Sequence, residues 1–124
     1  MKEITVKEFE AIIKEMPKNV LFLDVRTPGE YKACHINGLK NIPLDQLSTH
    51  VNELKKYDTI YISCGTGMRS GKGCIALSSL GLTNVVNVQG GLEAWKSVGC
   101  PVEHGKGAIP IMRQGNTSLK NAVE

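Results

Sequence analysis

Cys64-Gly65-Thr66-Gly67-Met68-Arg69-Ser70 stands between two segments of different character. The run before it, residues 59–63, is apolar and β-branched, and small and apolar side chains follow it at the spacing of a helix. This order predicts a strand, a tight loop and a helix, and the cysteine is the first residue of the loop.

The heptapeptide has the composition of a loop that stabilises an anion. Gly65 and Gly67 tolerate the positive φ that lets successive backbone amides point inward. The following helix adds unpaired N–H groups and the positive end of its dipole, and Arg69 adds a fixed positive charge. The nearest anion is the thiolate of Cys64, and such surroundings lower a cysteine pKa from about 8.5 to roughly 3.5–7.5. We therefore interpret Cys64 as a nucleophile that is ionised at neutral pH.

A plainer interpretation of Cys64 is a small buried side chain at the end of a core strand, which is the usual role of a free cysteine. That interpretation leaves the two glycines, the arginine and the helix start without an explanation, so the nucleophile is favoured. Arg69 has two open roles: it either attracts an anionic substrate or braces the loop.

The composition is that of one globular domain. The chain has 124 residues, of which 41% are hydrophobic and 22% are charged, and its formal net charge is +3. No basic stripe indicates a nucleic-acid partner, and no apolar run has the length of a membrane span. Residues 1–19 lack the pattern of a signal peptide, so we expect a cytoplasmic protein with no membrane partner.

The cysteines of the chain are expected to be reduced thiols. There are four of them, Cys34, Cys64, Cys74 and Cys100. No two have the C-x-x-C spacing of a structural zinc site, so we expect neither a metal nor another cofactor. An ordinary apolar content without an export pattern also argues against a disulfide framework.

Strand and helix patterns alternate along the chain. A capping box at Thr5 and Glu8 begins a helix that Pro17 ends. The predicted strands are 20–25, 39–43, 59–63 and 85–88, and the predicted helices between and after them begin at Thr27 or Pro28, span 44–56, end at Gly81 and span 92–98. This alternation predicts an α/β fold with a parallel sheet and helices on both faces.

Polar side chains with open roles follow the first long strand. Asp24 and Arg26 are either surface residues or an ion pair that fixes a loop beside Cys64, since ligands bind at the carboxyl ends of parallel strands. His35 and Cys34 are adjacent on a turn, and neighbouring turn residues usually point apart. We therefore favour a structural role for His35 over metal or acid–base chemistry, and treat all three residues, Asp24, Arg26 and His35, as supporting the site.

Several motifs together match one known family in order and spacing. They are Leu23-Asp24-Val25-Arg26 with Pro28, Glu30 and Tyr31; His35-Ile36 with Gly38 and Asn41-Ile42-Pro43; the heptapeptide 64–70; and Val88, Gly90-Gly91 and Trp95. On these residues the chain resembles a single-domain rhodanese, a sulfurtransferase, over residues 3–102. The resemblance implies a rhodanese-like fold with a five-stranded parallel sheet in a domain of residues 1–103, and leaves 104–124 as a C-terminal tail.

The resemblance also implies an activity. Cys64 would take sulfane sulfur from thiosulfate or another persulfide donor, carry it as a persulfide, and pass it to a thiophilic acceptor. Such an acceptor is cyanide, a small thiol or a cysteine of another protein. The substrate-binding residues implied are Gly65, Thr66, Gly67, Met68, Arg69 and Ser70.

Alternatives to a sulfurtransferase remain open from the sequence. The domain could be a persulfide carrier or a partner-docking module with little turnover of its own. Related phosphatases, and arsenate reductases on the same scaffold, are a second alternative. The phosphatase loop is Cys-x5-Arg, whereas the loop here is Cys-x4-Arg and suits a single sulfur atom better than a tetrahedral oxyanion. Departures from the family pattern at Cys34, Leu39 and Cys74 leave open a second thiol near the site.

Overall fold

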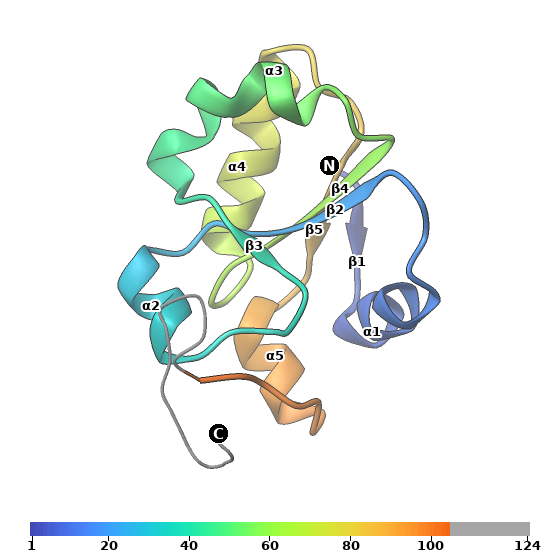
Figure 1. Ribbon diagram of the computed structural model, residues 1–124, viewed down its shortest axis with the longest axis vertical. Coiled ribbons are helices and arrows are strands. Elements are labelled where there is room, and N and C mark those ends of the chain that lie inside the picture. The colour runs from blue at the N-terminus through green and yellow to red at the C-terminus, as the bar shows by residue number, and fades with distance from the viewer. Residues whose placement is uncertain (105–124) are drawn as a thin grey trace.

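The apolar runs of the sequence pair into one parallel sheet. The computed structural model describes residues 1–104 and arranges the strands in the order β1-β5-β4-β2-β3 (Figure 1). The strands are β1 (Glu3–Ile4), β2 (Val20–Asp24), β3 (Lys40–Asn41), β4 (Thr59–Ser63) and β5 (Val85–Val88). Neighbouring strands are parallel in every pair. The predicted five-stranded parallel sheet is confirmed, although β1 is too short to give a hydrophobic pattern of its own.

The helices lie between the strands, as the alternation predicted. They are α1 (Val6–Glu15), α2 (Pro28–Ala33), the 3₁₀ helix η1 (Leu44–His50), α3 (Val51–Leu54), α4 (Met68–Ser79) and α5 (Gly91–Ser97). The capping box predicted at Thr5 is present, and Thr27 begins α2 with a second one. Gly81, at φ +95°, follows the end of α4 as expected.

The prediction of one α-helix over residues 44–56 is wrong. The segment begins as the 3₁₀ helix η1 and has regular α geometry only in α3. The hydroxyl of Thr49 donates to the carbonyl of Gln46 at 2.7 Å, a local bond that competes with the helical backbone pattern. Weak helix formers in the middle of the segment therefore outweigh the helical spacing of its leucines.

Each face of the sheet has its own core, because successive side chains of a strand point to opposite faces. Ile60 and Ile62 of β4 belong to the core beneath η1, α3 and α4. Tyr61 packs into the core on the other face, where Phe9 of α1 and Trp95 of α5 are buried. Helices cover both faces, as predicted (Figure 1).

The loops that follow β2, β4 and β5 meet at the carboxyl ends of these strands. The ends of β2 and β4 are in register, with Asp24 opposite Ser63, and Ile62 is opposite Asn87 of β5. The residues that follow these strands therefore meet, and Cys64 is among them. After α5 the chain returns to this region through an antiparallel bridge between His35 and Glu103. The predicted tail, apart from its first residue, lies outside the described residues.

Candidate active site

The sulfur of Cys64 lies in the loop between β4 and α4 and accepts hydrogen bonds from both sides of that loop. The amide of Gly67 donates to Sγ at 3.0 Å, and the hydroxyl of Ser70 lies 3.3 Å from it. The side chain is only 1% exposed. The strand, loop and helix predicted from the sequence are confirmed, with α4 beginning at Met68.

Helix α5 orients two peptide groups of the loop, those that carry the amides of Gly65 and Thr66. The amide of Leu92 donates to the carbonyl of Cys64 at 2.8 Å, and the amide of Glu93 donates to that of Gly65 at 2.9 Å. Both donors belong to the first turn of α5, where helix amides have no partner within the helix. A side chain at Gly91 would place its Cβ 2.2 Å from the Cys64 oxygen, so only glycine permits this approach.

These donors lower the pKa of Cys64 despite its burial. Burial by itself raises the pKa, but hydrogen bonds from the Ser70 hydroxyl and from the backbone of Ser70, Gly67 and Thr66 outweigh it. The pKa of Cys64 is therefore below its ordinary value. Hydrogen bonding to the charged form is the main cause, and the charge of Arg69 interacts with that of Cys64 as well.

The two loop glycines have different roles, which corrects the sequence interpretation. Gly67 has the expected positive φ of +97° and precedes α4 as its N-cap, whereas Gly65 is not in that conformation. A Cβ at Gly65 would lie 3.3 Å from a guanidinium nitrogen of Arg69. A side chain at Gly65 would therefore press against the guanidinium of Arg69.

Arg69 is held by Glu30 of α2. Its Nη1 and Nη2 donate to the two carboxylate oxygens at 2.7 and 3.0 Å. The Arg69 bond, followed by the Thr27 amide, lowers the pKa of Glu30 to about 2, so the pair is ionised at any ordinary pH. Of the two roles left open for Arg69, this geometry favours bracing. Sequence analysis missed the contact, although Glu30 stands at the fourth position of a Thr-x-x-Glu capping box.

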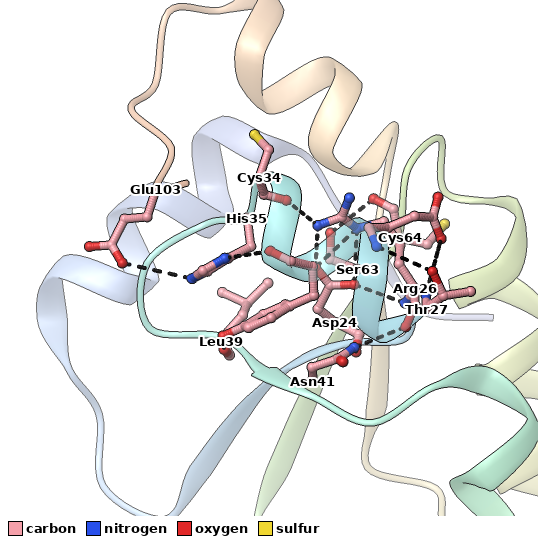
Figure 2. Close-up of polar contacts among 12 residues, drawn as sticks. Asp24, Arg26, Thr27, Cys34, His35, Leu39, Asn41, Ser63, Cys64 and Glu103 are labelled. Atoms are coloured by element: carbon pink, nitrogen blue, oxygen red, sulfur yellow. Dashed lines mark hydrogen bonds and ion pairs between the residues drawn. The ribbon is translucent and has the colours of Figure 1, made fainter. Parts of the chain in front are cut away.

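Asp24 and Arg26 form a buried ion pair, and Figure 2 shows it beside the Cys64 loop. Nε and Nη2 of Arg26 bond both carboxylate oxygens at 3.0–3.2 Å, and its amide donates to the same carboxylate at 2.9 Å. Nη2 also donates to the carbonyl of Cys34, and the Asn41 amide bonds the carbonyls of both pair members. The pair thus joins β2, α2 and β3 rather than facing solvent.

His35 lies apart from the sulfur and joins two segments of chain (Figure 2). Its ring stacks on Tyr31 with centroids 3.9 Å apart. Nδ1 lies 2.7 Å from the Tyr31 carbonyl and therefore donates to it, while Nε2 lies 3.7 Å from a carboxylate oxygen of Glu103. Both ring nitrogens face polar partners, and the structural role of His35 stays a prediction.

The remaining loop residues and thiols are placed as follows. Thr66 and Met68 are exposed at the rim of the loop, and Ser70 is fully buried beneath it. Cys74 is buried within α4, and all four cysteines are free thiols.

Within residues 1–104 no group of three or more His, Cys, Asp or Glu side chains could hold a metal ion. None of the helices described for those residues is long and apolar enough to cross a membrane.

The comparisons with known proteins agree with this fold. Residues 5–98 match the model of the rhodanese-like domain, so the chain belongs to the rhodanese-like domain family. It is 34% identical over 93 residues to the putative sulfur carrier protein YrkF of Bacillus subtilis, covering 75% of this chain and 50% of YrkF. It is 36% identical over 74 residues to thiosulfate sulfurtransferase PspE of Escherichia coli, covering 58% and 70% of the two chains.

A solved structure is also similar to this chain in sequence and fold. The chain is 32% identical to a rhodanese-related protein from Thermoplasma volcanium, with a TM-score of 0.72 and coverage of 83% of this chain and 98% of that one. The family is one of sulfur-transfer proteins, for which a sulfur donor and a sulfur acceptor are the general partners. The chain spans only half the length of YrkF, so that relative has a further part without a counterpart in the match.

Proposed function

We propose that this protein is a sulfurtransferase that moves sulfane sulfur from thiosulfate or another persulfide donor to a thiophilic acceptor through a persulfide on Cys64. The observation that carries the proposal is the surroundings of Sγ. Gly67 and Ser70 donate to a buried sulfur whose pKa is lowered, and α5 ties the competing carbonyls away from it. A thiolate is the form that attacks sulfur.

In the first half-reaction the Cys64 thiolate attacks the outer sulfur of the donor. With thiosulfate, a bond forms between Sγ and that sulfur, and the bond to the sulfite sulfur breaks. Sulfite leaves with the electron pair, and Cys64 carries a persulfide with one negative charge. The loop amides stabilise this anion in the way that preorganised donors stabilise developing charge elsewhere.

In the second half-reaction the acceptor attacks the outer sulfur of the persulfide. Cyanide leaves as thiocyanate and a thiol leaves as a new persulfide, and in both cases the electron pair of the broken bond returns to Sγ as the thiolate. The substrate pocket is the loop Gly65 to Ser70, with exposed Thr66 and Met68 at the rim where a donor or an acceptor enters. Asp24, Arg26 and His35 support this pocket through the segments they join.

The proposal is tested by the mass of the intact protein after treatment with thiosulfate. We expect the protein to gain one sulfur atom and to lose it to cyanide as thiocyanate. Cys64→Ser should show neither event, whereas Cys34→Ser and Cys100→Ser should retain both. Sulfur that stays bound in Cys64→Ser overturns the proposal, and a loss of activity in Cys34→Ser as well as in Cys64→Ser establishes a two-thiol relay instead.

Two further measurements separate the alternatives. A persulfide carrier would show a full gain of mass but release sulfur to cyanide far more slowly than to a protein thiol. A phosphatase would hydrolyse para-nitrophenyl phosphate at a rate comparable to thiosulfate turnover. We expect neither result, because the Cys-x4-Arg loop encloses a single sulfur atom and Arg69 is bound to Glu30 rather than free for an oxyanion.

A further inference from the structure

The hydroxyl of Ser70 has two acceptors and one hydrogen. Its oxygen lies 3.3 Å from Sγ of Cys64 and 2.5 Å from Oδ1 of Asn87. Ser70 is fully buried and Asn87 is 2% exposed, so water does not replace either contact. Since a hydroxyl donates only one hydrogen, the sulfur and the amide oxygen compete for it.

Asn87 presents its oxygen to Ser70 because its other end is fixed. Its Nδ2 donates to a carboxylate oxygen of Glu3 at 2.9 Å and lies 3.4 Å from the Gly67 carbonyl. Glu3 is opposite Asn87 in the pairing of β1 with β5, two strands that lie side by side in Figure 1. A flipped amide would set Oδ1 against the carboxylate, so Glu3 determines which group Ser70 meets.

We propose that Asn87, oriented by Glu3, is a positioning residue that competes with the Cys64 sulfur for the hydroxyl hydrogen of Ser70 and thereby limits how strongly that sulfur is stabilised as an anion. The hydrogen points to Sγ while Sγ carries the negative charge. It returns to Asn87 when Sγ is neutral, as it is in the thiol and in the inner sulfur of a persulfide. No proton enters or leaves in this change; only the O–H bond of Ser70 rotates. The persulfide part of this inference rests on the proposed function.

A different role for Asn87 would be to brace the loop through the Gly67 carbonyl. That carbonyl already accepts the amide of Gly71 at 3.1 Å, the first backbone bond of α4, which is shorter than the 3.4 Å contact with Asn87. The brace is therefore redundant, and competition for the hydrogen is the larger effect. The two roles predict opposite signs: removing a competitor lowers the pKa of Cys64, whereas removing a brace raises it.

The test is the pH profile of Cys64 alkylation, followed by peptide mass analysis in the full chain. In Asn87→Leu we expect the pKa of Cys64 to fall by about one unit, a tenfold change in proton affinity. In Ser70→Ala we expect it to rise by about the same amount. The double variant should match Ser70→Ala, because Asn87 acts only through the hydroxyl. A pKa that rises or stays constant in Asn87→Leu, or an Asn87 effect that persists without Ser70, overturns the inference.

A second variant avoids any change in the core. Glu3→Ala lies on the exposed edge strand and releases the Asn87 amide, so the pKa of Cys64 should fall by a smaller amount, about threefold in proton affinity. Gln89→Ala is the matched control, because Gln89 bonds the other oxygen of Glu3 at 3.1 Å. It should leave the profile unchanged. The fall should also vanish when Glu3→Ala is combined with Ser70→Ala, because loss of the carboxylate charge alone would act without the hydroxyl. A fall that persists in this double variant, or an equal fall in Glu3→Ala and Gln89→Ala, overturns the inference. Alkylation needs no sulfur donor, so these outcomes do not depend on sulfur uptake. If the wild-type protein took up no sulfur from thiosulfate, that result would refute the proposed function but not the role of Asn87.

Discussion

Cys64 and Cys74 lie at the start and in the middle of one loop–helix unit, and each is only 1% exposed. Hydrogen bonds hold the pKa of Cys64 below its ordinary value despite its burial. Burial, followed by the negative charge of Glu3, raises the pKa of Cys74 to about 12. Depth in the protein therefore does not decide which thiol reacts; the number of N–H and O–H groups that face the sulfur does.

The largest expected effect is the difference in alkylation rate between these two thiols. At pH 7 about one Cys74 side chain in 10⁵ is a thiolate, given a pKa of about 12. Iodoacetamide labelling of the native protein, followed by peptide mass analysis, should modify Cys64 several orders of magnitude faster than Cys74. Equal rates would mean that the loop donors do not act on Sγ in solution.

The second prediction concerns the close contact between Gly91 of α5 and the Cys64 loop. Gly91→Ala should destabilise the protein and raise the pKa of Cys64 toward that of a free cysteine, because its Cβ would lie 2.2 Å from the Cys64 oxygen. Gly81→Ala is the matched control, since Gly81 also has a positive φ but has nothing within 4 Å of the added Cβ. It should cost only the backbone strain, about 1–2 kcal/mol, with no change in the alkylation profile. An unchanged profile in Gly91→Ala would show that α5 does not orient the loop amides.

The third prediction concerns stability at alkaline pH. Cys74 stays protonated in the folded protein up to a pKa of about 12, whereas the unfolded chain loses this proton above about pH 9. Between these values the unfolded state binds fewer protons, so the free energy of unfolding falls by about 1.4 kcal/mol per pH unit as pH rises. Urea unfolding of Cys74→Ala should lack this part of the slope, while the wild-type protein and the variant of the half-buried Cys34, Cys34→Ala, retain it. Parallel slopes in all three would contradict the assigned burial of Cys74.

The smallest effect is expected at the partly exposed pair of Arg69 and Glu30. Arg69→Lys keeps the charge but loses the bidentate hydrogen bond to Glu30. This loss should cost less than about 1 kcal/mol of stability and slow sulfur transfer a few-fold. If Arg69 braces the loop, Glu30→Gln acts in the same direction. A lower KM for thiosulfate in Glu30→Gln would instead show that Arg69, once released, attracts the anionic donor.

The sequence predicts the part of the site that is local. Gly67 and Ser70 lie within six residues of Cys64, so a strand, a glycine loop and a helix start were enough to indicate an anion-holding sulfur. The alternating patterns likewise predicted the sheet and both layers of helices. Local reasoning was wrong about Gly65, which does not have a positive φ and lies close to the guanidinium of Arg69.

The rest of the site depends on contacts between distant segments, and those residues have ordinary side chains. Glu30, Asn87 and Leu92 reach the loop only because the strand order places α2, β5 and α5 around it. Nothing in the local pattern of an asparagine inside an apolar strand marks it as a partner of Ser70. Gly91 was the exception, since a double glycine before a helix could have indicated a close backbone approach.

The bonds to the loop carbonyls come from Leu92 and Glu93, which are synthesised after the Cys64 loop. A nascent chain that has left the ribosome as far as α4 contains Cys64 and its glycines, but it lacks the segment that turns the peptide groups around the sulfur. We expect the thiol of such an intermediate to be less acidic than that of the folded domain, because α5 does not yet orient the amides of Gly65 and Thr66. A chain in which residues 80–104 fail to dock should therefore react more slowly with electrophiles, although it contains Cys64.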